Sequence, residues 1–335
     1  MANYNDLKRN IEENYNIEVL DIIKVKSSYR VETKNKNYCL KVIKYNFSHF
    51  LFIIGAIKHL VNKQCEGIIN IIPTVTGRDY IRVDVYYAYL TDWLNTRECN
   101  YDNPLDTYLA VNALSKLHAK SYGFELNSNM KPRIGWFKWI ENYRTRSDEI
   151  VNFGQRIIEK DTKTAFDSMY LEAMEEELLR AEASIENLIC SEYILKMEEE
   201  IQLKGFCHHD YAHHNVLIGE NQKVFVIDFD YCILDSHLHD LSSLLIRVMK
   251  NGKWELRTTK DLLNIYNNTS NLQEKDTAIM AAFMEFPQAY WQLGIQYYWE
   301  RQPWEEEIYI KRLEKILEDR QEKQEFIEDF RLFKV

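Results

Sequence analysis

Two nearby segments, 205-GFCHHDYAHHNVLI-218 and 224-VFVIDFD-230, decide the fold of this 335-residue chain. The first segment carries four of the chain's nine histidines within seven positions, beside a cysteine and an aspartate. This composition leaves two interpretations open. Either the imidazoles bind a transition metal, or Asp210 and Asn215 carry a different chemistry and the histidines support the loop.

A transition-metal site needs imidazoles that point at one ion. Histidines at positions i and i+4 meet this condition on a helix, but the residues on both sides of the cluster have a strand-like pattern. In such a loop the imidazoles point in several directions. His237 and His239 could complete a site, but nothing in the spacing requires it. We therefore favour backbone or carboxylate partners for most of these histidines.

The aspartate and asparagine of the first segment have a spacing typical of phosphoryl transfer. His208-x-Asp210-x-x-x-x-Asn215 matches the kinase catalytic-loop pattern H-x-D-x-x-x-x-N. In that pattern the aspartate orients the proton of the acceptor hydroxyl, and the asparagine oxygen binds Mg²⁺. Asp228 follows a short predicted strand, where a second oxygen ligand for Mg²⁺ belongs. Together the two segments predict a Mg²⁺-dependent phosphoryl transfer.

The overall composition predicts a folded, soluble intracellular protein. Hydrophobic residues make up 46% of the chain, which supports a substantial core. The formal net charge of −10 argues against a nucleic-acid partner, because such partners need a basic surface. The six cysteines include no C-x-x-C pair and are expected to be reduced thiols of a cytosolic protein. No apolar run is long enough to cross a membrane, and the polar N-terminus is not a signal peptide.

Roughly the first ninety residues have the pattern of a small, mainly antiparallel sheet that carries one helix. The predicted strands are Val19–Lys26, Tyr29–Thr33, Tyr38–Ile43, Ile68–Val75 and Tyr80–Leu90. A helix is expected between the third and fourth strands, from Ser48 as N-cap to Asn62. The resulting order β-β-β-α-β-β predicts a β-rich N-lobe.

The rest of the chain is predicted to be mostly helical, with one strand pair. Leu105–Ser121 is amphipathic, and Thr164–Leu203 is a long helical stretch broken near Cys190. Strand-like pieces at Gly205–Cys207, Val216–Ile218 and Val224–Ile227 surround a hairpin turn, and helical periodicity resumes at Leu238. We therefore expect an α+β fold with two lobes, residues 1–91 and 92–335, and a ligand site where the lobes meet.

These motifs resemble the aminoglycoside phosphotransferase/choline kinase-like branch of the protein-kinase fold. Within that branch, FCHHDYAHHNVLI…VFVIDFDYCILDSHLHDLSSLLIRVMK is similar to the CotS family of bacterial spore-coat proteins. The resemblance covers Asn37–Lys44, residues 91–99, Leu114–His118 and Gly205–Lys250. It implies ATP and Mg²⁺ as cofactors, a small-molecule acceptor, other spore-coat proteins as further partners, and a place in the mother-cell cytoplasm or the coat.

The resemblance also assigns roles to individual residues. It implies that Asp210 is the catalytic base and that His208 braces its loop. The remaining implied roles are Mg²⁺ ligation by Asn215 and Asp228, support of the catalytic-loop backbone by Asp240, nucleotide phosphate binding by Lys41, and hinge contacts to adenine by Tyr89 and Thr91.

The chain departs from the kinase pattern at two places. The loop between the first two predicted strands, Lys24–Arg30, contains no glycine that would let the backbone approach the phosphates. The predicted helix after Lys41 also has no acidic residue from Phe47 to Lys63, and Glu66 lies past its end. The glutamate that normally orients the phosphate-binding lysine is therefore missing, which reduces turnover more than nucleotide binding.

Two main hypotheses follow, and they belong to different functional classes. The first is an enzyme that transfers the γ-phosphoryl group of Mg-ATP to a small-molecule hydroxyl, and the trio Asp210, Asn215 and Asp228 favours it. The second is a catalytically degenerate kinase-fold scaffold of the spore coat, which the acid-free helix favours. A histidine-rich metalloenzyme is the third and least favoured reading.

The acceptor site has the weakest sequence signal. Aromatic residues cluster near the C-terminus at positions 290, 291, 297, 298, 299 and 304. They could form a box for a quaternary amine, but helical spacing favours a place in the core. Asp235, Glu285 and Glu300 could bind a cationic acceptor, and ordinary surface roles are favoured for each.

Overall fold

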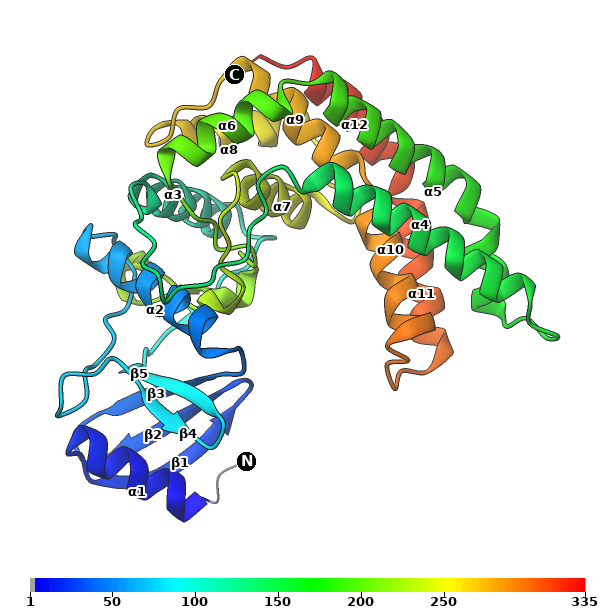
Figure 1. The fold of residues 1–335 in the computed structure, drawn as a ribbon. Helices are drawn as coiled ribbons and strands as arrows, with labels where there is room; N and C mark the ends of the chain where they lie inside the picture. Colours follow the sequence, from blue (N-terminus) through cyan, green and yellow to red (C-terminus); the bar gives the residue numbers. More distant parts are fainter. Residues whose placement is uncertain (1–3, 335) are drawn as a thin grey trace. The chain divides into compact units, whose positions relative to one another are not determined.

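The computed structural model describes residues 4–334, and the chain folds into two compact units (Figure 1). The first unit consists of Met1–Ile134 and Leu203–Leu234, and the second consists of Gly135–Gln202 and Asp235–Val335. The lobe boundary expected between residues 91 and 92 lies inside the first unit and stays a prediction. All residues of the two deciding sequence segments belong to the first unit.

A five-stranded antiparallel sheet dominates the N-terminal part of the first unit, in the order β1-β2-β3-β5-β4. The strands are β1 (Val19–Val25), β2 (Ser28–Thr33), β3 (Asn37–Ile43), β4 (Ile81–Val83) and β5 (Tyr86–Asp92). The first three predicted strands are confirmed within two residues at each end. The stretch predicted as one strand from Tyr80 to Leu90 is instead two strands, because the chain turns at Asp84 with a positive φ of 54°.

The predicted strand Ile68–Val75 is wrong. In this segment Ile72 alone forms an isolated bridge, in which its N–H donates to the carbonyl of Leu90 at 2.8 Å. Pro73 follows directly and has no N–H to continue a ladder. The alternating apolar residues around it therefore form an irregular connection.

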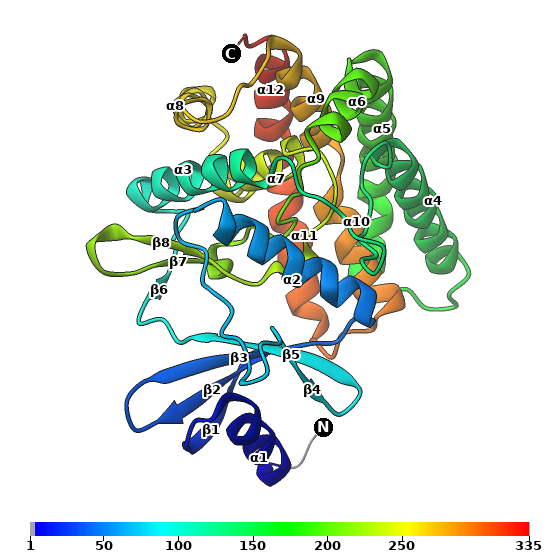
Figure 2. The same ribbon diagram turned by 60° about the vertical axis from the view of Figure 1, so that its left-hand side comes forward.

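Two helices accompany the sheet. The predicted helix is confirmed as α2 (Phe47–Asn62), but its N-cap is Asn46, whose side chain accepts from the His49 N–H at 2.9 Å. A further helix that the sequence analysis does not predict, α1 (Tyr4–Tyr15), lies on the opposite side of the sheet from α2 (Figure 2). It buries only Leu7, Ile11 and Tyr15, one residue per turn, against the core of the sheet.

The second half of the first unit holds the segments singled out by the sequence. Its elements are β6 (Arg97–Glu98), α3 (Pro104–Ser121), the short 3₁₀ helix η1 (His213–Asn215), β7 (Val216–Ile218), η2 (Glu220–Gln222), β8 (Val224–Val226) and η3 (Phe229–Tyr231). Strands β6, β7 and β8 form a small antiparallel sheet. The predicted hairpin is thereby confirmed, and Cys207 joins Ile233 through an isolated bridge in place of the short strand predicted there.

The second unit consists mostly of helices. They are α4 (Trp139–Ile158), α5 (Ala165–Cys190), α6 (Tyr193–Leu203), α7 (Leu238–Met249), α8 (Leu256–Asn267), α9 (Glu274–Glu285), α10 (Gln288–Gly294), the π-helical turn η4 (Ile295–Trp299), α11 (Glu306–Glu318) and α12 (Arg320–Arg331). The predicted break near Cys190 is confirmed between α5 and α6. No helix within residues 4–334 has both the length and the apolar character needed to cross a bilayer.

The C-terminal aromatic residues belong mainly to the core of the second unit. Tyr290 and Tyr298 are buried in a cluster with Phe166 and Tyr170, and the rings of Tyr170 and Tyr290 stack at 4.1 Å. Trp299 is more exposed, at 43%. The core interpretation that helical spacing favours is confirmed for the two buried tyrosines.

The surface roles favoured for Asp235 and Glu285 are wrong, because both carboxylates are buried in the second unit. Asp235 accepts from the Trp139 indole N–H at 3.0 Å, and burial raises the pKa of Asp235 to about 6. Glu285 accepts from Arg331 at 2.7 Å. Buried carboxylates need such partners, and sequence spacing gives no sign of partners this distant.

Candidate active site

Lys41 is the buried cation around which the candidate site is built. It lies on β3 directly opposite Tyr89 of β5, so the two side chains share one face of the sheet. Its Nζ donates to Asp228 Oδ2 at 2.8 Å and to Ser27 Oγ at 3.0 Å, and it lies 3.2 Å from Asp230 Oδ2. A strand, a turn and the second deciding segment thus meet at one ammonium group.

Ser27 reaches Lys41 because the turn between β1 and β2 is very short. Val25 pairs with Ser28, which leaves only Lys26 and Ser27 in the loop, and Lys26 has a positive φ of 51°. Lys26 also forms a salt bridge with Glu98 of β6, at 2.5 Å. The glycine-free turn therefore approaches the lysine through a serine hydroxyl.

Asp228 occupies a strained backbone position at the end of the strand β8. Its φ of 65° and ψ of 64° lie in the left-handed region, which residues other than glycine, asparagine and aspartate rarely adopt. The chain turns there into η3, where buried Phe229 packs on the His208 ring at 4.9 Å between ring centroids. The Oδ1 atoms of Asp228 and Asp230 are buried and accept no hydrogen bond within residues 4–334.

Lys41, Asp228 and Asp230 shift one another's pKa values. Burial opposes the charge of Lys41, but the carboxylates of Asp230 and Asp228 raise its pKa above the ordinary value. Burial likewise opposes the charge of Asp228, yet Lys41 holds the pKa of Asp228 below its ordinary range. Burial and the neighbouring charge of Asp228 raise the pKa of Asp230 to about 7. Asp228 is therefore the ionised partner, and Asp230 readily takes up a proton.

His208 links the catalytic-loop segment to the end of β8. Its Nε2 lies 2.8 Å from the carbonyl oxygen of Ile227, and the ring contacts Tyr211 edge-on. The Ile227 N–H donates in turn to the carbonyl of Asn215 at 3.0 Å. Two contacts to one residue thus fix the loop against the strand that carries Asp228.

Asp210 and Asn215 contact each other directly. The Asn215 Nδ2 group donates to the Asp210 carboxylate at 3.1 Å and to the Asp210 carbonyl at 2.9 Å. Because the nitrogen of the carboxamide is engaged in this way, its oxygen is left on the other side as an acceptor. Asn215 is buried and closes η1, whereas Asp210 is half-buried.

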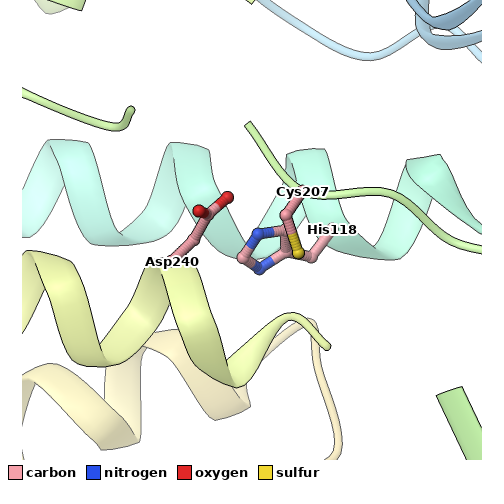
Figure 3. Close-up of side chains that lie close together, drawn as sticks. All are labelled: His118, Cys207 and Asp240. Atoms are coloured by element: carbon pink, nitrogen blue, oxygen red, sulfur yellow. The ribbon is translucent and has the colours of Figure 1, made fainter. Parts of the chain in front are cut away.

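The other histidines of the segment have separate surroundings. His209 has a positive φ of 68°, and the rings of His213 and His214 are nearly perpendicular at 5.2 Å. Cys207 lies beside His118 of α3, and its Sγ is within 4.8 Å of a nitrogen of the His118 ring (Figure 3). Asp240, which Figure 3 also labels, is in the first turn of α7 in the second unit, and its role in supporting the catalytic loop stays a prediction.

The predicted hinge residues Tyr89 and Thr91 lie inside β5, where they pair with Lys41 and Cys39 of β3. The Tyr89 side chain is 6% exposed, and burial together with Asp230 and Asp228 raises its pKa. Its side chain therefore lies on the same face of the sheet as Lys41. The adenine contacts of Tyr89 and Thr91 stay predictions.

Sequence reasoning missed two partners of Lys41, namely Asp230 and Ser27. A signal for the first was present, because the segment Val226–Asp230 carries a second acid two positions after Asp228. The sequence of α2 indeed has no acid, so Asp228 and Asp230 are the carboxylates at Lys41 in the described chain. The charge of the lysine is thus balanced without a helix glutamate.

A five-stranded sheet with a buried lysine, an H-x-D-x-x-x-x-N loop and a following aspartate that pairs with this lysine are features of a kinase-like fold of the aminoglycoside phosphotransferase type. Known structures agree. An aminoglycoside phosphotransferase from Alicyclobacillus acidocaldarius covers 95% of this chain and 93% of its own, with a TM-score of 0.83 and 17% identity. Spectinomycin phosphotransferase APH(9)-Ia, in an AMP-bound complex, covers 98% of both chains with a TM-score of 0.69 and 13% identity.

Sequence comparison then gives the family. The family described as "Spore coat putative kinase YutH" matches residues 8–330, so the chain belongs to this family. Spore coat protein S of Bacillus subtilis (strain 168) is 24% identical over 302 residues, which cover 90% of this chain and 85% of that protein. The resemblance to spore-coat proteins with a kinase-like fold is thereby confirmed.

Proposed function

We propose that this protein binds Mg-ATP in its first unit and transfers the γ-phosphoryl group to a hydroxyl of a small molecule. The main support for the proposal is the ion pair between Lys41 and Asp228, two residues that are 187 positions apart in the sequence. The contact between Asp210 and Asn215 adds to it. Fold neighbours support it, since one is an AMP-bound phosphotransferase and another is an amicoumacin kinase with AMP-PNP and Ca²⁺.

The residues at this site fit a hard divalent cation. Asp228 and Asp230 each have a buried oxygen that accepts no hydrogen bond from residues 4–334, and Asn215 offers a carboxamide oxygen. Mg²⁺ prefers such oxygen ligands over imidazoles. We assign Asn215 and Asp228 as its ligands, with Asp230 beside them. The bound cation would neutralise charge on the phosphates.

Protein side chains supply the remaining functions. Lys41 binds the nucleotide phosphates, and Ser27 at the turn replaces the glycine-rich cover that the chain lacks. Asp210 accepts or orients the proton of the acceptor hydroxyl, and the contact with Asn215 fixes its carboxylate. His208 holds the loop through Ile227 and is a positioning residue.

The scaffold hypothesis remains the alternative, and the acid-free α2 favours it. Against it stand Asp228 and Asp230, which give Lys41 two carboxylate partners where a scaffold would need none. A thermal-shift titration with Mg-ATP tests binding first. We expect stabilisation that rises with ligand concentration, and a protein that is not stabilised by any nucleotide would overturn the proposal.

A second experiment separates an enzyme from a nucleotide-binding scaffold. ATP hydrolysis is measured for the intact protein, for Asp210→Asn and for the exposed control Asp161→Asn. Asp210→Asn is expected to lose about 10²–10³-fold in turnover with nucleotide binding retained, because a positioned base contributes about that much. Equal rates for Asp210→Asn and the intact protein would mean that Asp210 is not the base.

A further inference from the structure

Arg133 forms a second cationic group in the first unit, beside the turn that carries Asp230. Its guanidinium lies between two aromatic rings, 4.9 Å from the centroid of Tyr45 and 5.2 Å from that of Tyr231. Its Nη2 donates to the carbonyl of Asp230 at 3.1 Å. The rings and this hydrogen bond hold the guanidinium plane in a defined orientation.

The backbone around Arg133 is fixed at both ends. The Lys131 N–H donates to the carbonyl of Ser48 in α2 at 3.0 Å. The Leu234 N–H donates to the carbonyl of Arg133 at 3.1 Å, and Ile134 forms a bridge with Leu234. The backbone that carries Arg133 is therefore held in place by hydrogen bonds to the rest of the first unit.

The charge of Arg133 has no carboxylate partner within residues 4–334. An arginine offers five N–H donors, and the described chain accepts one of them. The nearby carboxylates of Asp228 and Asp230 are engaged with Lys41. Burial and the charge of Arg133 lower the pKa of His49, so this neighbouring imidazole is neutral at pH 7. A half-buried, oriented and uncompensated cation is a site for an anion.

The turn that carries Tyr231 connects Arg133 to the loop of the proposed catalytic base. The neighbouring Tyr45 hydroxyl, burial and the negative charge of Asp210 raise the pKa of Tyr231, whereas the positive charge of Arg133 lowers it. Tyr231 ends the 3₁₀ turn η3 that follows Asp228, and His208 ties the loop that carries Asp210 to Ile227, one residue before Asp228. Tyr231 is 46% exposed, so a ligand from solvent can reach the group.

We propose that Arg133, Tyr45 and Tyr231 bind a carboxylate or phosphate group of the acceptor and so present one of its hydroxyls to Asp210. This inference rests on the proposed phosphotransferase function and names its substrate class, an anionic hydroxyl compound. An uncompensated arginine would repel a protonated amine, the group present in aminopropanol, after which one fold neighbour is named. The acceptor of this chain thus differs in charge from that amine.

Four hexoses of similar shape and different charge test the inference. Glucuronate carries a carboxylate, glucose 6-phosphate carries a phosphate, glucose is neutral and glucosamine is cationic. Their affinities are measured by titration calorimetry on the full chain, with and without AMP-PNP and Mg²⁺. We expect at least one anionic sugar to bind about tenfold more tightly than glucose, as one charge-assisted hydrogen bond allows. Which anion binds distinguishes a carboxylate from a phosphate acceptor.

Variants of the arginine assign the preference to its side chain. Arg133→Met keeps an apolar side chain between the rings and is expected to abolish the preference, whereas Arg133→Lys retains part of it. Arg257→Met, at an exposed position of α8, serves as the matched control and retains the full preference. Nucleotide binding is expected to be the same in all of these proteins.

Three results would overturn the inference: equal or absent binding of all four sugars, tightest binding of glucosamine, or an anion preference that survives in Arg133→Met. Failure of the phosphotransferase proposal has a separate signature. In that case the intact protein would bind no AMP-PNP, while the sugar titrations without nucleotide would still report whether Arg133 selects an anion.

Discussion

Lys41 and Arg133 both contact Asp230 of the 3₁₀ turn η3, but the described chain pairs only the charge of Lys41 with carboxylates. Lys41 is 5% exposed and has two carboxylates within 3.2 Å. Arg133 contacts the backbone carbonyl of Asp230 and the faces of two rings. The first charge is compensated inside the protein, and the second is available to a ligand. We therefore propose that Lys41 marks the nucleotide side of the site and Arg133 the acceptor side.

The largest loss of turnover is expected when Asp228, the partner of Lys41, is replaced. Asp228→Ala removes a proposed Mg²⁺ ligand and the closest partner of Lys41. Turnover should fall by about a thousandfold, as expected for loss of preorganised charge at a reacting group. The measurement is ATP consumption at saturating acceptor, with Asp161→Ala as control. Retention of more than a tenth of the activity would place the metal elsewhere.

A comparison of stabilities tests the two cations directly. Lys41→Met leaves two carboxylates, 27% and 18% exposed, without a cation, and we expect a loss of about 3 kcal/mol at pH 8, the lower end for a broken buried pair because of this exposure. Arg133→Met strands no carboxylate and should cost about 1 kcal/mol, from the lost hydrogen bond and ring contacts. Urea unfolding of both variants gives the values, and equal losses would remove the distinction between the two cations.

The loss in Lys41→Met should depend on pH. The pKa of Asp230 is already raised to about 7, and removing the lysine raises it further. The folded variant therefore binds a proton more tightly than the unfolded chain, so its stability rises as pH falls from 8 to 5. Unfolding curves at these two pH values check this. If Lys41→Met loses the same stability at pH 8 and at pH 5, the lysine does not act by compensating the charge of the carboxylates.

Asp230 is expected to matter for turnover more than for binding. Because α2 has no acid, Asp230 is the second carboxylate that can position Lys41. Asp230→Asn keeps the shape of the side chain and should lower kcat about tenfold, with ATP affinity changed by less than about threefold. Steady-state kinetics and calorimetry together measure this split. Parallel loss of both quantities would instead indicate that Asp230 binds the nucleotide complex itself.

The smallest effect is expected at the turn over Lys41. Ser27→Ala removes one hydrogen bond to the ammonium group, at 3.0 Å, and leaves both carboxylates in place. Nucleotide affinity should change by about tenfold or less, since one such bond contributes about 0.5–1.5 kcal/mol net. Ser128→Ala, at an exposed position, is the control. A change above thirtyfold would make Ser27 the main phosphate-binding group.

Much of the fold follows from local sequence patterns. Alternation of apolar residues predicts the first three strands, and turn residues predict the β7–β8 hairpin. Helical periodicity predicts the helices on either side of the break after Cys190. Helix α1 escapes such reasoning because only three of its residues are buried, among many charged ones. The strand predicted at Ile68–Val75 fails because apolar alternation there is not accompanied by a partner strand.

Local sequence patterns also predict only part of the candidate site. Asp210, Asn215 and Asp228 follow from a spacing within one short stretch of sequence. Ser27 and Arg133 become visible only when β1, β2 and the segment before Gly135 are brought to the same turn. Neither residue has a distinctive neighbourhood in sequence, so the tertiary fold alone identifies them.

Calorimetric titration of the full chain with AMP-PNP is the decisive test of whether the first unit binds a magnesium nucleotide. We expect saturable one-to-one binding in Mg²⁺ that weakens strongly in EDTA and is lost in Asp228→Ala. Binding of equal strength with and without Mg²⁺, or no binding in either buffer, would contradict it.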